Sequence, residues 1–387
     1  MERIYFDHNS TTPLEPRALE AMLPYLRETF GNASSVHSFG QFAKAGLEQS
    51  RETIADLLNC RPEEIYFTSG GTESDNTAIK GVADALGHKG KHIITSSVEH
   101  HAVLETCEYL EKHGYDVTFL PVDRMGYINP DELKDALRDD TILVAIMLGN
   151  NETGTLQDIK KLAEIAHARD IYFHTDAVQA LGKVRVDIRE LGVDLLAGSA
   201  HKFYGPKGVG ILYAKAGTRF TPYAHGGAHE RGKRAGTENV AAIVGMAKAL
   251  ELDLAEMAAN TARIEKLADK LYDGVLTIPD VTFNGDPENR IKGTLNFTFM
   301  GCEGEATILS LDMKGIAVSS GSACTSGAVE PSHVLRAMGV PAELAQTAIR
   351  FSLGKDNTEA QVDYTLEQLP AIINRLRQMS PIYAQSR

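Results

Sequence analysis

The stretch ILVAIML, residues 142–148, is an unbroken apolar run with the length of one strand. A strand that is apolar on both faces is buried on both faces, which is typical of a parallel sheet covered by helices. Residues with helical spacing, among them Ile159, Leu162 and Ala166, follow this run and would cover one face of the sheet. The stretch therefore predicts an α/β fold in which helical crossovers join parallel strands.

The alternation of strands and helices extends through the first two thirds of the chain. The expected strands are Glu64–Thr68, His92–Ser96, Asp116–Leu120, Ile142–Leu148, Ile171–Thr175, Leu195–Gly198 and Gly208–Tyr213. After Ala235 the pattern changes to a long helical stretch and then to the segments Val281–Asn284, Gly293–Thr298, Gly304–Leu311, Ile349–Leu353 and Thr358–Met379. We expect a large domain with a mainly parallel central sheet over residues 14–255 and a smaller α+β domain from residues 1–13 and 256–387. A helix is expected to cross the boundary near residue 255.

Composition limits the class of protein. The chain has 387 residues, 43% of them hydrophobic and 24% charged, which is typical of a folded globular protein. The net charge of −13 opposes nonspecific binding to nucleic acid or to an anionic membrane. The four cysteines are far apart and form no CxxC motif, so we expect no disulfide framework and no zinc site. With neither a secretory signal nor a long apolar span in the sequence, we expect a cytoplasmic protein.

The segment TSGGTESD, residues 68–75, lies between an expected strand and an expected helix. Gly71 lets the backbone approach a ligand, and Thr72 adds a hydroxyl where free N–H groups and the helix dipole favour a phosphate. An ordinary helix start with a Ser or Thr cap explains the segment equally well. The segment matches neither a P-loop nor a GxGxxG motif.

Two further segments follow strands. In FHTDAVQ, residues 173–179, Asp176 and Gln179 stand at the carboxyl end of a strand, where open parallel sheets bind ligands. A helix cap is the alternative interpretation of Asp176. In GSAHKFYGPKG, residues 198–208, Lys202 lies among small residues, and a partly desolvated lysine can form a Schiff base with a carbonyl. A solvated surface lysine is the alternative. Together, a phosphate cradle, a strand-end Asp and a pocket Lys meet the needs of pyridoxal phosphate.

The segment SSGSACTSGAVE, residues 319–330, contains one thiol, Cys324, among hydroxyl residues and glycines. A structural cysteine normally lies in an apolar run, whereas this polar segment is typical of an exposed loop. Cys324 is therefore a candidate nucleophile, with an incidental loop cysteine as the alternative.

With these segments, the sequence resembles the cysteine desulfurases, in particular their group I (NifS/IscS-like) branch. These enzymes are fold-type I pyridoxal-phosphate enzymes of the class V aminotransferase family. The resemblance covers nearly the whole chain. It rests on Tyr5–Pro13, Gly31–His37, Thr68–Asn76, Glu99–Ala102, Asn150–Gly154, His174–Gln179, Ser199–Gly205, Arg234–Thr237, Ser319–Gly327 and Arg350–Ser352.

The resemblance implies release of sulfur from L-cysteine, with L-alanine as co-product and a persulfide on the enzyme. By motif, Lys202 would hold the cofactor covalently, Cys324 would form the persulfide and His100 would stack on the pyridine ring as an acid or base. Asp176 would face the ring nitrogen, and Arg350 would pair with the substrate carboxylate. The other implied contacts are Gln179 and Asn151 to the ring oxygen and substrate region, Gly71, Thr72, Ser199 and His201 to the phosphate, and Thr237 to the phosphate of a neighbouring subunit.

The last contact implies a homodimer with shared active sites. An IscU/NifU-like iron–sulfur scaffold protein would accept the sulfur, with a nitrogen-fixation role slightly favoured over a housekeeping one. No resident metal is expected, although Cys324 could transiently ligate an iron–sulfur cluster. The alternatives are a selenocysteine lyase, another pyridoxal-phosphate enzyme such as an aminotransferase, and a scaffold in the sulfur pathway that has lost catalysis.

Overall fold

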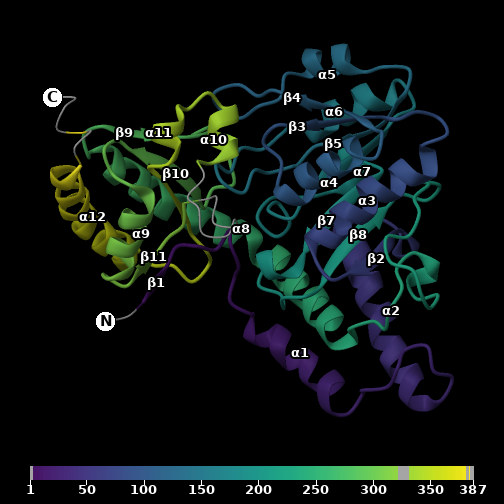
Figure 1. Cartoon of the computed structure of the whole chain (residues 1–387). Helices are drawn as coiled ribbons and strands as arrows, with labels where there is room; N and C mark the ends of the chain where they lie inside the picture. Colours follow the sequence, from purple (N-terminus) through teal and green to yellow (C-terminus); the bar gives the residue numbers. More distant parts are fainter. Residues whose placement is uncertain (1–2, 321–330, 381–382, 384–387) are drawn as a thin grey trace.

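A seven-stranded sheet forms the centre of the larger part of the molecule (Figure 1). The computed structural model describes residues 3–320, 331–380 and 383, and the strand order in this sheet is β2-β8-β7-β6-β5-β3-β4. Strands β3 to β7 are parallel, and β8 is antiparallel to both β7 and β2. The predicted α/β fold with a mainly parallel sheet is confirmed. The strands are β2 (Ile65–Thr68), β3 (His92–Ser96), β4 (Asp116–Leu120), β5 (Thr141–Ala145), β6 (Tyr172–Asp176), β7 (Leu195–Ser199) and β8 (Gly210–Ala214).

Helices cover both faces of this sheet, as the apolar run at residues 142–148 predicts (Figure 1). Val144 of β5 packs into a core with residues of α2, α6 and the long helix α8 (Val240–Leu276). Its neighbours Leu143 and Ala145 belong to the core on the opposite face, with residues of α3 and α4. Successive residues of a strand point to opposite faces, so a strand between two cores needs apolar residues at every position. The helices of the larger part are α1 (Pro16–Arg27), α2 (Ser38–Leu58), α3 (Gly71–Leu86), α4 (His101–Glu111), α5 (Pro130–Ala136), α6 (Ile159–His167) and α7 (Ile188–Leu191).

Strand β5 ends earlier than the apolar run predicts. Beyond the end of β5, the N–H groups of Ile146 and Leu148 still donate to carbonyl oxygens of the neighbouring strand β6, those of His174 and Asp176. The intervening N–H of Met147 donates to both carboxylate oxygens of Glu99, at 3.0 and 2.9 Å. A side chain therefore replaces the neighbouring strand at this end of the sheet.

A smaller region lies beside the seven-stranded sheet, on the left in Figure 1. It contains an antiparallel sheet in the order β12-β10-β9 and a parallel pair, β1 with β11. Phe6 near the start of the chain packs in the same core as Phe297 and Phe351. Its elements are β1 (Ile4–Tyr5), β9 (Val281–Phe283), β10 (Thr294–Phe299), α9 (Gly304–Asp312), β11 (Ile316–Ala317), α10 (His333–Ala337), α11 (Ala342–Ala345), β12 (Ala348–Ser352) and α12 (Glu359–Met379).

Helix α8 (Val240–Leu276) joins the two regions. Leu250 in its first half belongs to a core of the large sheet, and Leu271 in its second half belongs to the core of the smaller region. A single helix thus fixes the two regions relative to each other. The long helical stretch predicted after Ala235, which was expected to cross residue 255, is therefore present.

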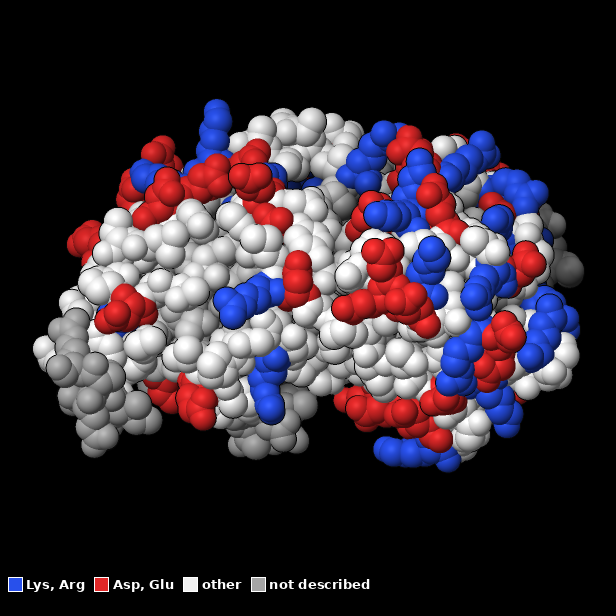
Figure 2. All heavy atoms as spheres, turned by 90° about the horizontal axis from the view of Figure 1, so that it is seen from above, with Lys and Arg blue, Asp and Glu red and all other residues white. Residues whose placement is uncertain are grey.

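The surface carries charges of both signs. Figure 2 shows Lys, Arg, Asp and Glu side chains mixed over the larger region, and a broad area with few charges over the smaller one. The excess of acidic residues therefore forms no single acidic face in this view. Across the described part of the chain, no helix is both long enough and apolar enough to cross a membrane.

Candidate active site

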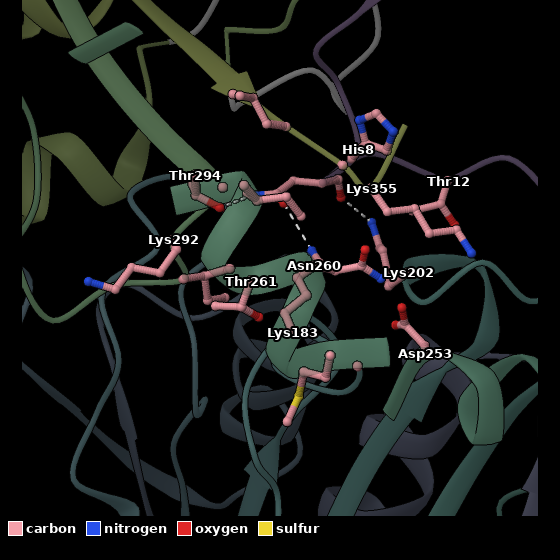
Figure 3. A pocket seen from close by; sticks show the side chains of 18 of the residues that line it. His8, Thr12, Lys183, Lys202, Asp253, Asn260, Thr261, Lys292, Thr294 and Lys355 are labelled. Atoms are coloured by element: carbon pink, nitrogen blue, oxygen red, sulfur yellow. Dashed lines mark hydrogen bonds between the residues drawn. The ribbon is translucent and has the colours of Figure 1, made fainter. Parts of the chain in front are cut away.

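Lys202 stands at the carboxyl end of the sheet, in the one-turn 3₁₀ helix Ala200–Lys202 that directly follows β7. Its Nζ donates to the backbone carbonyl oxygens of Asn9 at 2.6 Å and Ser10 at 2.8 Å. Figure 3 shows Lys202 in a pocket between the larger and smaller regions. Lys202 is therefore an oriented side chain in a pocket, as the sequence predicts, and not a solvated surface lysine.

Asp176 is the last residue of β6, the strand paired with β7. Its side chain is buried, and its Oδ1 accepts a hydrogen bond from the backbone N–H of Val178 at 2.8 Å. Burial raises the pKa of Asp176 to about 6, while this hydrogen bond and the charge of Lys202 lower it. A buried carboxylate is stabilised by a cationic partner, which a protonated ring nitrogen supplies.

An open cavity of about 360 Å³ lies at the N-terminus of α3. Among the residues lining it are the four predicted contacts to the phosphate of the same subunit: Gly71, Thr72, Ser199 and His201. A Cβ at Gly71 would meet Val178 Cγ2 at 2.5 Å, so this position has no room for a side chain. The helix cap is Gly70, which has no side chain to occupy the first N–H groups of α3, so these groups and the helix dipole favour an anion.

The sheet brings the anion cradle close to the lysine. A Cβ at Gly210 of β8 would lie 2.6 Å from Gly70 Cα, so the turn before α3 packs directly against the sheet. His201, adjacent to Lys202, hydrogen-bonds through Nδ1 to Thr11 Oγ1 at 3.1 Å. Cradle, lysine and aspartate together fit pyridoxal phosphate, because they provide an anion site, an amine and a buried carboxylate.

His100 is the N-cap of α4 and its Nδ1 accepts from the backbone N–H of Ala102 at 3.1 Å. Burial lowers the pKa of His100 to about 4, and the nearby charge of Lys202 adds to this effect. The neutral ring therefore carries its hydrogen on Nε2. At neutral pH His100 is therefore an uncharged imidazole, and it lies close enough to Lys202 for the lysine charge to lower its pKa.

Gln179 contacts Asn9, a residue without a predicted role. Its Nε2 donates to the carbonyl oxygen of Asn9 at 2.8 Å, the same oxygen that accepts from Lys202. Its Oε1 accepts from Lys183 Nζ at 2.7 Å. Asn9 and Lys183 therefore belong to the site, and the only sequence signal for Asn9 is its place in the motif at residues 5–13.

Arg350 of β12 lies at the edge of the site, with a buried side chain. Its guanidinium donates to Asp7 Oδ1 and Ser10 Oγ, each at 2.8 Å, and to the carbonyl oxygen of Asn151 at 2.9 Å. Within the described residues its buried Nε has no hydrogen-bond partner. The structure thus brings Asn151 and Arg350 together, and a substrate carboxylate would share or displace the contact with Asp7.

Thr237 is exposed on the loop that precedes α8 and does not line the cavity at α3. The same loop is tied to the start of α3, since Arg234 Nε lies 2.9 Å from Glu73 Oε1. The predicted nucleophile Cys324 lies outside the described residues. Ser319, the first residue of the segment that contains Cys324, forms an isolated antiparallel bridge with Arg350, through two backbone hydrogen bonds of 2.6 and 3.2 Å.

The other three cysteines are Cys60, Cys107 and Cys302. Cys107 and Cys302 are buried in apolar cores, and Cys60 packs against one. Burial raises the pKa of all three thiols, to about 12 for Cys60 and about 11 for Cys302. These thiols stay protonated at neutral pH, which suits packing residues. Across the described residues, no group of three or more His, Cys, Asp or Glu could hold a metal ion.

Comparison with known proteins places the chain in a family. Residues 4–365 match the family model "Aminotransferase class-V". The chain is 55% identical over 379 residues to cysteine desulfurase IscS of Dictyoglomus turgidum, covering 98% of this chain and 96% of the relative. It is 49% identical over 385 residues to cysteine desulfurase IscS of Escherichia coli O139:H28, covering 98% and 95%.

A solved structure described as a NifS-like protein superimposes with a TM-score of 0.92 at 40% identity, covering 96% of this chain and all of the other. The family uses pyridoxal phosphate, in agreement with the groups at the site. The fold, the site and these similarities lead to one conclusion: the chain belongs to the class V aminotransferase family, within its cysteine desulfurases.

Proposed function

We propose that this chain removes sulfur from L-cysteine with pyridoxal phosphate, and that Lys202, Asp176 and Cys324 carry the reaction. The observation that supports this most is the meeting of Lys202 and Asp176 at the ends of paired strands beside an anion cradle. An aminotransferase has the same need for the first two groups. Cys324 is the group that a desulfurase needs in addition, since a thiol must accept the sulfur.

Pyridoxal phosphate supplies an aldehyde for amines and a ring that accepts electrons from the substrate. Lys202 would hold the cofactor through its aldehyde, and the free Lys202 amine would take the Cα proton of the bound cysteine. Asp176 keeps the ring nitrogen protonated, because a buried carboxylate favours a cation beside it. His100 presents an uncharged ring that neither repels the substrate ammonium group nor competes for the phosphate.

Arg350 binds the substrate carboxylate. Its planar guanidinium matches two carboxylate oxygens, and its Nε is the donor with no hydrogen-bond partner among the described residues. Asp7 also accepts a hydrogen bond from the guanidinium, at 2.8 Å, and holds it in place. Asn151 lies beside Arg350 and would help to orient the bound amino acid.

Cys324 attacks the substrate sulfur as a thiolate. A sulfur–sulfur bond forms and the substrate carbon–sulfur bond breaks, with the electron pair passing to the carbon fragment. After protonation this fragment leaves as L-alanine, and Cys324 retains the sulfur as a persulfide. The thiol proton leaves Cys324 and a proton is added to the alanine carbon, so the step needs no external oxidant or reductant.

The test separates the amine from the thiol. Lys202→Ala should abolish both alanine formation and the absorption of the lysine-linked cofactor. Cys324→Ala should keep that absorption and bind cysteine, yet release no sulfide under reductant. Cys60→Ala is the matched control and should behave as the wild type. Alanine formation by Lys202→Ala, or unchanged sulfide release by Cys324→Ala, would contradict the proposal.

The functional unit that we propose is a homodimer with shared sites. Five apolar side chains near the start of α2 and the end of α1 are each more than half exposed, which is typical of a protein interface. They form the aromatic surface, which consists of Leu26, Phe30, Val36, Phe39 and Phe42. Thr237 faces outward on a loop tied to the phosphate cradle, so it can reach the phosphate of a second subunit.

The sulfur acceptor that we propose is an iron–sulfur scaffold protein. The loop and tail sequences slightly favour a nitrogen-fixation-type acceptor over a general one. Transfer of labelled sulfur to a scaffold of each type decides between them. Assays with selenocysteine and with a keto acid test the selenocysteine lyase and aminotransferase alternatives, and faster turnover of either than of cysteine would overturn the assignment.

A further inference from the structure

A second lysine, Lys183, lies beside Lys202. It follows β6 by seven residues, and its Nζ donates to Gln179 Oε1 at 2.7 Å and to Asn9 Oδ1 at 3.0 Å. Lys202 Nζ donates to the backbone oxygen of the same Asn9 at 2.6 Å. The two amines therefore bind opposite ends of one asparagine, and Figure 3 shows both pointing to the same side of the pocket.

Both lysines line a cavity of about 50 Å³ between the larger and smaller regions. Both lysines are partly buried, so solvent screens their charges less than it screens charges on the open surface. Within the described part of the chain, no carboxylate lies within ion-pair distance of Lys183 Nζ. Its partners are two neutral amide oxygens, which orient a positive charge without cancelling it.

The charged surroundings of Lys183 come from several elements. Burial and the charges of Lys202 and Arg350 lower the pKa of Lys183, and Asp253 on α8 raises it, with a resulting pKa of about 7. Because the charge of Lys202 contributes to this lowering, loss of the Lys202 proton favours the charged form of Lys183. The effect is mutual, because the charge of Lys183 also lowers the pKa of His8 and His201. The groups that face Lys183 are Lys202, His201, Arg350, His8 and Asp253, with Lys292, Tyr204 and Lys355 also lining the cavity.

We propose that Lys183 is a positioning residue whose positive charge, held behind Lys202 by Gln179 and Asn9, favours loss of the proton from Lys202. A lysine that must act as a free amine is activated by a cation close to it. Lys183 also fixes Gln179 and Asn9, so the same residue holds the acceptors that aim the Lys202 amine. This inference rests on the proposed role of Lys202.

The test uses the holoenzyme and the absorption of its bound cofactor as a function of pH. Lys183→Met and Lys183→Gln should move the midpoint of the spectral transition to higher pH by about one unit, a tenfold change in proton affinity. Lys183→Arg keeps the charge and should restore the midpoint. At pH 7 the kcat of the two neutral variants should fall, with little change in the KM for cysteine.

Lys292→Met is the matched control. Lys292 lines the same cavity, but its Nζ lies 2.8 Å from Glu265 Oε1, so its charge is already paired. Its spectrum should titrate as the wild type does. If Lys183→Met retains no cofactor, the test rests on Lys183→Gln, because its polar side chain can still contact Gln179 and Asn9.

The midpoint distinguishes the proposal from a structural role. A wild-type midpoint in Lys183→Gln, or the same shift in Lys183→Arg as in Lys183→Met, would overturn the proposed effect of charge. Failure of the desulfurase function itself would show in the wild type, as absence of alanine, and is therefore distinguishable.

Discussion

Asp176 shows how a functional residue works against stability when its ligand is absent. Its carboxyl group is buried beside β7 with one backbone donor, and burial raises its pKa from 3.8 to about 6. In the unfolded chain the same group ionises near its ordinary value. Folding without the cofactor therefore costs free energy above pH 6, where the folded state holds an ionised buried group, and costs none below about pH 4, where both states are protonated.

We predict that Asp176→Asn stabilises the cofactor-free protein at pH 7.5 by up to about 2 to 3 kcal/mol, the equivalent of two pKa units. The gain should vanish as the pH falls to about 4, because the wild-type carboxyl group is then neutral. Urea unfolding of both proteins across this range measures it. The same variant should bind pyridoxal phosphate more weakly.

Asp139→Asn is the control, since the Asp139 side chain is fully exposed and should show no such trend. Equal stability of the wild type and Asp176→Asn at pH 7.5 would contradict the view that the ionised, buried Asp176 destabilises the cofactor-free protein.

The site residues that the sequence predicts are those whose side-chain chemistry is unusual for the segment in which they stand. Lys202 and Asp176 stand at strand ends, where the fold class alone predicts a ligand. Asn9 was not predicted, because an asparagine near the start of the chain gives no sign in the sequence that its side chain and its carbonyl oxygen would meet Lys183, Lys202 and Gln179. Lys183 was missed because only the structure shows that its partners are neutral amides.

At the scale of elements, β2 forms an edge of the large sheet, and side chains bond its free side. Glu230 accepts from the backbone N–H of Phe67 at 2.9 Å, and Arg51 donates to the carbonyl oxygen of Ile65 at 2.7 Å. Arg51 and Glu230 are themselves paired, with Nη2 to Oε1 at 2.7 Å and both side chains buried. The pair joins α2 to the loop that leads to Thr237, so the edge of the sheet anchors a segment of the proposed dimer site.

Removal of either partner should leave a buried charge unpaired. We predict that Arg51→Met or Glu230→Gln lowers the free energy of unfolding by about 3 to 5 kcal/mol. The double variant should lose less than the sum of the two, because neither charge is then left alone. Chemical denaturation of the four proteins gives the coupling energy.

Lys248→Met removes an exposed pair with Glu251, and should cost less than about 1 kcal/mol. Additive losses in the double variant would show that Arg51 and Glu230 act independently.

For the whole molecule, the strand and helix pattern predicted the parallel sheet, the long helix α8 and the smaller region. The antiparallel insertion of β8 between β2 and β7 was not predicted, since strand direction depends on partners distant in sequence. Periodicity also could not show that Phe6 completes the core with Phe351. The domain boundary near residue 255 stays a prediction, because α8 is continuous across it.

The proposed dimer makes a prediction that only the whole assembly can satisfy. If Thr237 of one subunit binds the phosphate in the other, Lys202→Ala and Thr237→Ala fall in the same site of a mixed dimer, the site of the Lys202→Ala subunit. The site of the Thr237→Ala subunit then keeps its own Lys202 and receives Thr237 from the Lys202→Ala subunit. Mixing the two variants should therefore restore activity at low cofactor concentration, where loss of one phosphate contact weakens binding by about 10-fold or more.

Lys202→Ala mixed with Asp176→Asn is the control. Both residues act within one subunit, so no intact site can form and no activity should return. The masses of the dimers show whether subunits have exchanged. Phe42→Glu in the aromatic surface should reduce the mass of the protein in solution from about twice 42.1 kDa to that of the single chain. Rescue in the control would show that the recovered activity does not depend on Thr237. No rescue in the Thr237 mixture, once mixed dimers are detected, would mean that Thr237 serves its own subunit.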